Sequence, residues 1–499
     1  MGPVLLASRR LRLTVVLTAA ALFALAAGPV LANVGLTMVG SDPTTNTTSQ
    51  HRTQVEPDTF AAGNTIVSVF QTGRFFDGGA SGIAFATSTN GGSTWTRGVL
   101  PGITRVQTGT TGPYDRVSDP AVAFEAQDNA PTGVWLVSSL AIRNNPVRGV
   151  AVITSRSTNG GVTWSNPITT ATGSNLDKNW IVCDNNSASP FFGNCYTEFD
   201  ENADGNRIKM STSTNGGANW GAALNTGDNA TGLGGQPVVR PSGTVLVPIN
   251  NANQTQIRSF RSINGGASWR ATVLVSNATD HTVAGGLRTS PLPSAEIDSA
   301  GTAYVVWQDC RFRSNCASND IVMSKSTSET TWGTVTRVPI DAANSGRDHF
   351  IPGIGVDRTT SGGSARIGLT YYYYPTANCT AATCQLDVGY VSSTNGGATW
   401  SAPTMVTGPM TLSWLANTSQ GRMVGDYIST SVFPAANGGR AYPVIAVANP
   451  PSGGVFDEAM YVPTGGLPVT GGALRAQTGP VQVHTPNGPP AVPPGHTRR

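Results

Sequence analysis

Apolar and polar residues alternate over short runs along the whole chain, and tight turns separate these runs. Residues 119–124, 133–142 and 149–154 are such runs, each bounded by Gly, Pro, Asn or Asp. Of the 499 residues only 12% are charged, against 59 glycines and 33 prolines. Because long amphipathic helices need more charge on their solvent faces, the pattern predicts an all-β protein and excludes a helical bundle or coiled coil.

One eight-residue segment recurs five times, each time after a strand-like run. Its first copy reads Ser-Thr-Asn-Gly-Gly-Ser-Thr-Trp. The copies end at Trp95, Trp164, Trp220, Trp269 and Trp400, with a degraded sixth copy at Trp332. Asn-Gly supplies the positive φ angles of a tight hairpin, and we expect each Trp to cover the base of its hairpin. The repeats predict one supersecondary unit used many times.

The same order of elements surrounds each copy: an opening strand, two further strands, the repeated turn and a short fourth strand. Comparable openings occur near Glu56, Asp119, Lys178, Gln236, Pro293, Phe350 and Gly425. Residues 33–464 are therefore predicted to form a β-propeller of seven four-stranded blades. Six blades with an appended last unit is the alternative. Residues 34–39 are expected to complete the last blade, so that N- and C-terminal strands close the ring.

Residues 1–32 have the features of a secretory signal peptide. Arg9, Arg10 and Arg12 precede the apolar run 13–27, and small residues lead to a cleavage site after Ala32. We expect a secreted, extracellular protein with no membrane span after cleavage. An uncleaved anchor is the alternative, although the run is shorter than the ~20 residues that a span needs. The formal net charge of +3 comes from the two ends of the chain, so no basic patch for nucleic acid is predicted.

Residues 465–499 are rich in Gly and Pro and lack periodicity, which predicts a disordered tail. Leu467-Pro468-Val469-Thr470-Gly471 looks like a cell-wall sorting signal, but the residues that follow are polar and Pro-rich instead of hydrophobic. The sequence therefore does not establish that this signal is used.

The six cysteines form three close pairs, and export makes disulfides permissible. The predicted pairs are Cys183 with Cys195, Cys310 with Cys316, and Cys379 with Cys384. Zinc is the competing interpretation, but no C-x-x-C pair or nearby His completes a tetrahedral set.

The repeated segment resembles the Asp-box, or BNR repeat, of the sialidase superfamily. Asn stands where Asp is usual, at Asn90, Asn159, Asn215, Asn264 and Asn395. The resemblance covers residues 33–464 and implies a propeller fold. It further implies an exo-glycosidase of the sialidase type, which uses a Tyr nucleophile with a Glu partner, an Asp acid/base and an arginine cluster.

The resemblance places part of that catalytic set. Arg74 and Asp77 match the second-strand arginine and the acid/base, Tyr427 matches the nucleophile, and Arg311 matches another cluster arginine. Two members are missing: Gln54-Val55-Glu56-Pro57 replaces the first arginine, and Pro291 stands where the catalytic Glu belongs. Structural roles for the matching residues remain an alternative, so the sequence leaves open whether the protein is an enzyme.

Polar residues also gather at the starts of the predicted innermost strands, which converge near the axis of a propeller. They are Glu56, Asp58, Arg116, Asp119, Asp177, Lys178, Arg288, Asp348, His349, Arg422 and Asp426. We expect them to line a ligand site, where crowding of like charges raises a carboxylate pKa towards general-acid use. The alternative is that opposite charges pair and plug the channel.

One segment has calcium-binding spacing. Asp200, Asn202 and Asp204 follow the pattern D-x-N-x-D-G, which aims alternate oxygens at Ca²⁺. An Asp-Gly hairpin turn explains the same residues, and no cofactor is otherwise required.

Two functional hypotheses follow. The first is a secreted glycosidase-like propeller that acts on glycans at its central mouth. The second is a non-catalytic extracellular propeller that binds carbohydrate or protein there. In both we expect a monomer that does not bind nucleic acid, and neither the sugar nor the linkage follows from the sequence.

Overall fold

The structure is a computed structural model that describes residues 1–2 and 34–479. The chain divides into two units, Met1–Ala32 and Asn33–Arg499, and every element below belongs to the second. Nearly all of the predicted signal peptide and residues 480–499 of the predicted tail lie outside the described residues. Within the described ranges, no helix is long and apolar enough to cross a membrane.

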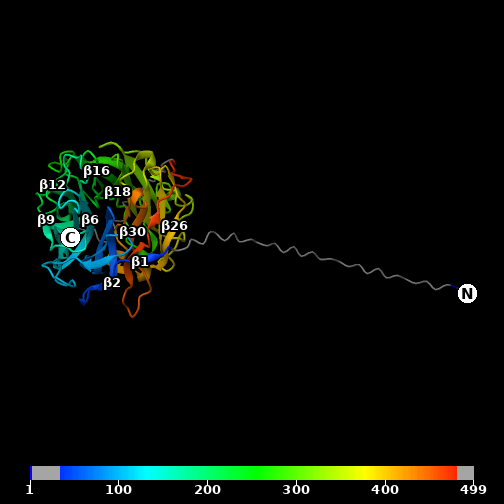
Figure 1. Ribbon diagram of the computed structural model, residues 1–499. Coiled ribbons are helices and arrows are strands. Elements are labelled where there is room, and N and C mark those ends of the chain that lie inside the picture. Colours follow the sequence, from blue (N-terminus) through cyan, green and yellow to red (C-terminus); the bar gives the residue numbers. More distant parts are fainter. Residues whose placement is uncertain (3–33, 480–499) are drawn as a thin grey trace. The chain divides into compact units, whose positions relative to one another are not determined.

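The described residues form 33 β-strands, six short 3-10 helices and no α-helix (Figure 1). The prediction of an all-β protein is therefore confirmed. The strands pair into antiparallel sheets, as expected for short alternating segments joined by tight turns.

Most of these strands fall into seven successive sets of four, called groups 1 to 7 here. Group 1 contains β2 (Gln50–Ala62), β3 (Thr65–Arg74), β4 (Ala80–Ser88) and β5 (Thr96–Val99). Group 2 contains β6 (Arg116–Glu125), β7 (Val134–Arg143), β8 (Arg148–Ser157) and the first half of β9 (Ile168–Cys183). Group 3 contains the second half of β9, β10 (Cys195–Glu201), β11 (Arg207–Ser213) and β12 (Leu224–Asn225).

The later groups repeat this order. Group 4 contains β14 (Val238–Val239), β15 (Val245–Asn251), β16 (Gln256–Ser262) and β17 (Val273–Asn277), and β13 (Gly232–Leu233) also pairs with β15. Group 5 contains β18 (Ser294–Ile297), β19 (Ala303–Asp309), β20 (Asp320–Ser326) and β21 (Thr336–Arg337). Group 6 contains β22 (His349–Val356), β23 (Ile367–Tyr373), β24 (Gln385–Ser393) and β26 (Thr404–Thr411). Group 7 contains β29 (Ser429–Val432), β30 (Arg440–Ala448), β31 (Glu458–Pro463) and β1 (Leu36–Met38).

The first strands of successive groups lie against one another. Contacts join β2 to β6, β6 to β9, β9 to β14, β14 to β18, β18 to β22, β22 to β29, and β29 back to β2. Hydrogen bonds accompany them: the Val122 backbone N–H donates to Asp58 Oδ2 at 2.7 Å, and Ser429 Oγ donates to the Thr59 carbonyl at 3.2 Å. The seventh group therefore touches both the sixth and the first.

The repeated Asn-Gly-Gly turns share one hydrogen-bond pattern. In the first, the Gly92 backbone N–H donates to Ser88 Oγ at 2.8 Å and the Thr94 N–H donates to Asn90 Oδ1 at 2.9 Å. The turns ending at Trp164, Trp269 and Trp400 repeat both bonds. Short polar side chains thus satisfy the backbone of each turn, which explains why Ser and Asn recur at fixed positions.

Each such turn also binds the group before its own. Thr87 Oγ1 in group 1 donates to the Gly161 carbonyl of the group 2 turn at 2.8 Å, and Lys325 Nζ in group 5 donates to the Gly396 carbonyl of group 6 at 2.9 Å. For group 1 the preceding group is group 7, where the Tyr442 hydroxyl donates to the Gly91 carbonyl at 2.8 Å. The turns therefore fasten neighbouring groups together.

Both ends of the described chain reach group 7. β1 pairs with β31 from Leu36 opposite Pro463 to Met38 opposite Tyr461, so the N-terminal segment supplies the outer strand that the sequence predicted. The disorder predicted from Gly465 onwards is wrong for residues 465–479.

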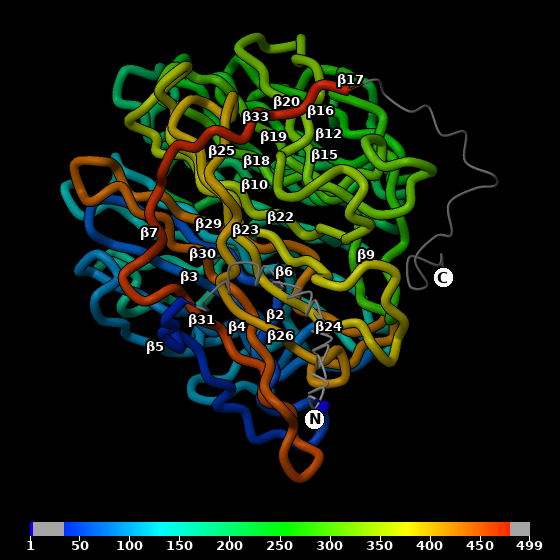
Figure 2. Tube along the Cα trace, turned by 90° about the vertical axis from the view of Figure 1, so that its right-hand side faces the viewer, coloured from blue at the N-terminus to red at the C-terminus, as the bar shows by residue number. Residues whose placement is uncertain are grey.

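The C-terminal segment pairs with two groups instead. β32 (Leu467–Pro468) pairs with β30, and β33 (Leu474–Arg475) pairs with β25 (Thr399–Trp400) (Figure 2, red). Leu467 and Val469 are buried, which explains the order of this segment despite its composition. The same burial removes these two side chains of the sorting-signal-like sequence from solvent.

All three predicted disulfides are present: Cys183–Cys195, Cys310–Cys316 and Cys379–Cys384. The first joins β9 to β10 in group 3, and the other two close loops that follow the second strands of groups 5 and 6. They staple neighbouring parts of the chain and bridge no two groups.

Candidate functional site

The first strands of four groups carry a β-bulge at the same place. The register of pairing with the second strand shifts at one place in each of these strands. The shift lies between Val55 and Asp58 in group 1, between Ser118 and Ala121 in group 2, at Lys178 in group 3, and between Phe350 and Gly353 in group 6. The residues at the bulges have positive φ: Glu56 (56°), Asp119 (46°), Lys178 (50°) and Ile351 (50°). Left-handed backbone is costly for residues other than glycine and concentrates at functional sites.

Three of these bulge residues meet in what we call the central cluster. The central cluster consists of Glu56, Arg74, Asp119, Lys178, Arg288 and Asp426. At its centre Asp426 forms ion pairs with Lys178 Nζ and with Arg288, whose Nε donates to Asp426 Oδ1 at 2.6 Å. Lys178 Nζ lies 3.7 Å from Asp119 Oδ1. Residues from groups 2 and 3 and from the loops before groups 5 and 7 thus converge.

Group 1 supplies the other side of the central cluster. Gln71 Nε2 donates to Glu56 and, at 2.9 Å, to Ser118 Oγ. Arg74 Nη1 donates to Gln71 Oε1 at 3.0 Å and to the Gly79 carbonyl at 2.9 Å. Gln71, a polar residue inside the buried strand β3, therefore connects the Glu56 carboxylate of group 1 to Ser118 of group 2.

The charges of the cluster respond differently to burial. Burial raises the pKa of Asp119 to about 8, because desolvation outweighs the attraction of Lys178, and burial also raises the pKa of Glu56. Burial acts the same way on Asp426, but Arg288 and Lys178 overcome it and hold its pKa below the ordinary value. With Asp119 largely protonated at neutral pH, the three cations outnumber the ionised carboxylates.

A small pocket lies beside the cluster. It is lined by Lys178, Asn179, Trp180, Gly234, Gln236, Leu292, Pro293 and Tyr427. Its void of ≈ 10 Å³ has room for about one water molecule. Because the lining residues come from group 3 and from the segments that lead into groups 4, 5 and 7, this pocket also lies where first strands of several groups begin.

Tyr427 stands at this pocket as a buried aromatic. Its hydroxyl donates to the Pro120 carbonyl at 3.2 Å, and its ring lies edge-on to Trp180 with centroids 4.8 Å apart. Burial and the nearby Glu56 and Asp119 carboxyls raise the pKa of Tyr427 well above its usual value. In the described part of the chain its hydroxyl has no hydrogen bond to a carboxylate, which a Tyr nucleophile needs for activation.

Asp77, on the turn that follows β3, lies next to Arg116, the first residue of β6. Arg116 Nη1 forms an ion pair with Asp77, its Nε donates to Asn144 Oδ1 at 2.7 Å, and its guanidinium lies 4.4 Å from the Phe75 ring centroid. Arg116 lowers the pKa of Asp77 against the effect of burial. Asp77 is therefore an ionised, arginine-paired carboxylate.

Arg311 lies in a different environment from Arg74 and Tyr427. Its Nη2 lies 2.6 Å from Asp309 Oδ2, and its Nη1 donates to Ser276 Oγ at 2.8 Å. Its partners thus lie in β17 and at the end of β19. Among the described contacts none joins it to the central cluster, so the structure brings together Arg74 and Tyr427 but not Arg311.

Arg422 and His349 also differ in their surroundings. Arg422 lies on β28 (Gly421–Met423), which pairs with β27 (Ala416–Thr418), and its carbonyl accepts the Arg288 backbone N–H at 2.7 Å. It therefore positions the loop that carries Arg288. His349 is fully buried in β22 and has no described bond to the central cluster.

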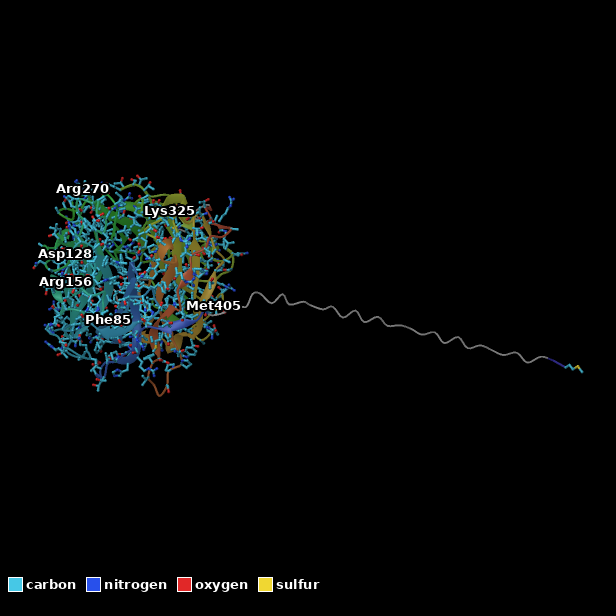
Figure 3. The ribbon with its side chains drawn as sticks, in the orientation of Figure 1. Phe85, Asp128, Arg156, Arg270, Lys325 and Met405 are labelled. Atoms are coloured by element: carbon cyan, nitrogen blue, oxygen red, sulfur yellow. A yellow bond between two sulfur atoms is a disulfide. The ribbon has the colours of Figure 1, made fainter. Side chains whose placement is uncertain are left out.

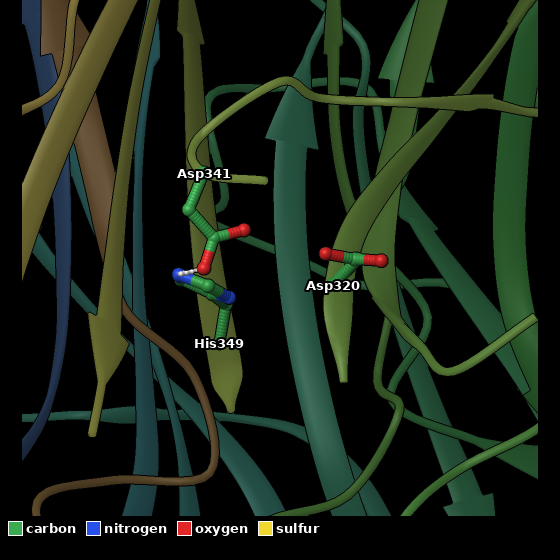
Figure 4. Close-up of side chains that lie close together, drawn as sticks. All are labelled: Asp320, Asp341 and His349. Carbon is green, nitrogen blue, oxygen red and sulfur yellow. Dashed lines mark ion pairs between the residues drawn. The ribbon is translucent and has the colours of Figure 1, made fainter. Parts of the chain in front are cut away.

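His349 belongs to a second buried group, which we call the arginine network. The arginine network consists of Arg313, Asp320, Arg337, Asp341 and His349. Asp320, Asp341 and His349 could place one ligand atom each within 4.8 Å of the others (Figure 4). However, Arg313 and Arg337 each pair with both carboxylates, at 2.5–2.8 Å. Because two guanidiniums already balance the two carboxylates, a divalent cation would meet strong repulsion.

The segment with calcium spacing forms the hairpin between β10 and β11, with a 3-10 turn at Asn202–Asp204 and Gly205 in the left-handed region. Asn206 Nδ2 donates to Asp200 Oδ2 at 2.9 Å and also to Asn202 Oδ1, and Asp204 pairs with Arg207 at the surface. The Asp-Gly hairpin is confirmed. A calcium ion would need the oxygens that Asn206 and Arg207 already engage.

Three residues that contact predicted site residues were not predicted from the sequence. Gln71 connects Glu56 to group 2, Trp180 holds Tyr427, and His281 bonds to Asp348 through Nδ1 at 3.0 Å. Gln71 could have been noticed as a polar residue in the middle of an apolar strand. His281 carried no pattern, because its partner is distant in sequence.

Comparisons with known proteins give information at the level of the fold. No protein-family model matches the chain, and no curated protein matches it significantly. Among solved structures, an ulvan lyase described as a new family of polysaccharide lyase shares 10% identity with a TM-score of 0.51, over 87% of this chain and 97% of that chain.

Other similar structures include sialidases. The intramolecular trans-sialidase from Ruminococcus gnavus shares 12% identity with a TM-score of 0.39, over 83% of this chain and 92% of that one. A protein of unknown function from Dyadobacter fermentans shares 15% identity with a TM-score of 0.44, over 72% of this chain and 99% of that one. At these identities the likeness concerns the fold alone.

Proposed function

We propose that this protein is a secreted β-propeller of seven four-stranded blades that binds an acidic glycan at the central cluster. Seven groups of four strands, the contact of β29 with β2, and the bond from Tyr442 to the turn of group 1 support the closed ring. Three disulfides support an oxidising compartment outside the cell.

The observation that carries the proposal is the excess of cations in the central cluster. Arg74, Lys178 and Arg288 face carboxyls of which Asp119 is largely neutral at pH 7. An anion, such as a carboxylate or sulfate group on a sugar, would compensate this charge, and a guanidinium binds either bidentately. The similar ulvan lyase has also been solved with a GlcA(1-4)Rha3S saccharide.

Arg288 is the basic residue most open to a ligand in this cluster, since 15% of its side chain is exposed against 5% for Lys178. The test is binding of the mature protein to an array of uronic-acid, sulfated and sialylated oligosaccharides. We expect Arg288→Gln to abolish binding and higher salt to weaken it.

Arg270→Gln is the matched control, because Arg270 is exposed, lies at the edge of the molecule in Figure 3 and has no described contact with the cluster. We expect it to bind as the wild type does. Equal binding by wild type and Arg288→Gln, or no binding to any acidic glycan, would contradict the proposal.

Cleavage of the bound glycan is a second candidate function. Asp119 favours it, because a carboxyl whose pKa is about 8 is a proton donor at neutral pH. The sialidase mechanism is less well supported, since the Tyr427 hydroxyl bonds to a backbone carbonyl and Arg311 bonds elsewhere. A fluorogenic sialoside and a uronate lyase assay, each with Asp119→Asn as control, separate these activities. Calcium is not part of the proposed function, because Asn206 and Arg207 already bond to the side-chain oxygens that would coordinate it.

A further inference from the structure

Phe76 is an exposed aromatic residue next to the central cluster. It lies on the turn that follows Arg74, which the Phe75 N–H closes by donating to the Gly79 carbonyl at 2.9 Å. Phe75 is buried beneath Arg116, whereas 52% of Phe76 is exposed. The Arg74 guanidinium binds the same Gly79 carbonyl, so this turn is fastened directly to the cluster.

Polar groups flank Phe76 in fixed positions. The neighbouring Asp77 side chain is 54% exposed, yet Arg116 holds its carboxylate, and Asn144 holds Arg116 in turn. On the other side the Ser419 N–H donates to the Phe76 carbonyl at 2.8 Å. Ser419 lies between β27 and β28, on the hairpin whose Arg422 supports the Arg288 loop, so the turn and the cluster share their scaffold.

The apolar surface continues past the turn. Gly78 has φ 125° and no side chain, and a Cβ there would lie 3.8 Å from Val147 Cγ1. Val147 is itself 36% exposed. Single exposed apolar residues are ordinary, but here an aromatic ring and an aliphatic group lie beside a fixed carboxylate and amide.

This combination matches one ligand chemistry. A sugar ring has an apolar face of C–H groups, which packs on an aromatic ring, and equatorial hydroxyls at its rim, which donate to carboxylates and amides. We propose that Phe76, Asp77 and Val147 form a second sugar subsite, so that the ligand is a chain of at least two units. The acidic group of one unit pairs with Arg288, the most exposed cation of the central cluster, and the next unit stacks on Phe76. This inference rests on the proposed function.

The experiment compares chain lengths. Calorimetry measures the affinity of the protein for two ligands. The first is the acidic oligosaccharide that binds most tightly on the array, and the second is the acidic monosaccharide from the charged end of that oligosaccharide. We expect Phe76→Ala to weaken oligosaccharide binding about tenfold, which corresponds to about 1.4 kcal/mol, and to leave monosaccharide binding unchanged. Phe76→Trp, which keeps an aromatic face, should stay within about threefold of the wild type.

Leu274→Ala is the matched control, because Leu274 is 47% exposed on the outer strand β17 of group 4. It should change neither affinity.

Each other outcome has a distinct meaning. Equal oligosaccharide affinity in wild type and Phe76→Ala, with Arg288→Gln still inactive, overturns the subsite and leaves the proposed function standing. Absence of acidic-glycan binding in the wild type overturns both. Self-association of the wild type that Phe76→Ala abolishes would assign this surface to a second copy of the chain and overturn the subsite.

Discussion

Two clusters of buried charge lie in this protein, and they differ in how completely their charges are paired. In the arginine network, Arg313 and Arg337 each bind both Asp320 and Asp341, so cations and carboxylates match. In the central cluster, Asp426 alone receives both Lys178 and Arg288, while burial raises the pKa of Asp119 and Glu56.

The backbone differs in the same sense. Glu56, Asp119 and Lys178 have positive φ at bulges, whereas none of the five residues of the arginine network appears among the described residues with positive φ. Strain persists where the surrounding structure enforces it. Buried charge therefore does not by itself mark a functional site; incomplete pairing on a strained backbone is the better indication.

The largest expected effect tests the arginine network. Arg337→Ala leaves Asp320 and Asp341 with one guanidinium instead of two in a fully buried environment. We expect the free energy of unfolding to fall by about 3–5 kcal/mol, measured by urea denaturation, while the folded fraction still binds the glycan. Arg270→Ala should cost less than about 0.5 kcal/mol. A similar value for both variants would contradict the structural role.

The next effect tests the central cluster. Asp426→Asn removes the carboxylate shared by Lys178 and Arg288, so we expect a loss of about 3 kcal/mol in the free energy of unfolding. Because the cluster adjoins a void with room for about one water molecule, chloride should restore part of this stability. Chloride should not rescue Asp320→Asn, since the side chains of Arg313 and Arg337 are only 2% and 0% exposed, against 15% for Arg288. Equal rescue of both variants would remove the distinction between the two clusters.

The pH dependence should sharpen the contrast. Asp119 has a folded-state pKa of about 8, above its ordinary value of 3.8, so the folded state holds a proton that the unfolded state releases. Stability should therefore fall as pH rises from about 4 to about 8, and anion binding should weaken as Asp119 ionises. Asp119→Asn should flatten the binding profile, measured by calorimetry, and reduce the slope of the stability profile, measured by thermal unfolding. The remaining slope would come from other buried carboxyls such as Asp58 and Asp280, whose pKa burial raises to about 7. Unchanged profiles would show that Asp119 is ionised throughout.

The smallest expected effect concerns the strained backbone. Glu56→Gly and Glu56→Ala both remove the carboxylate, but only glycine adopts φ 56° without strain. We expect the free energy of unfolding of the Gly variant to be about 1 kcal/mol higher than that of the Ala variant. The same pair at Asp58, which does not have positive φ, should favour Ala. Equal stability at Glu56 would mean that the bulge carries no strain.

Much of the fold followed from the sequence, because local chemistry fixes it. The Ser and Asn of each repeated turn bond to the turn's own backbone, so five copies revealed the strand order. The disulfides join cysteines close in sequence. The disorder prediction was wrong for residues 465–479 because Leu467 and Val469 are buried against distant strands, which composition does not reveal.

The site was less predictable, because its bonds join distant residues. The starts of the first strands identified Glu56, Asp119, Lys178 and Asp426, whereas Gln71 and His281 bond to partners that no local pattern indicates. Arg311 was assigned by resemblance alone. Its partner Asp309 is two residues away. A sequence motif matches the position of Arg311 but does not show in which direction its side chain points.

The pairing of β1 with β31 has a consequence for how the chain folds. Thr37 and Thr464 bond across 427 positions, so group 7 is incomplete until nearly all of residues 34–464 have been synthesised. The three disulfides join cysteines only 12, 6 and 5 positions apart and can form long before that. Contacts between residues far apart in sequence form slowly. We therefore expect β1 to stay unpaired until β31 has been synthesised, and their pairing then orders both segments together.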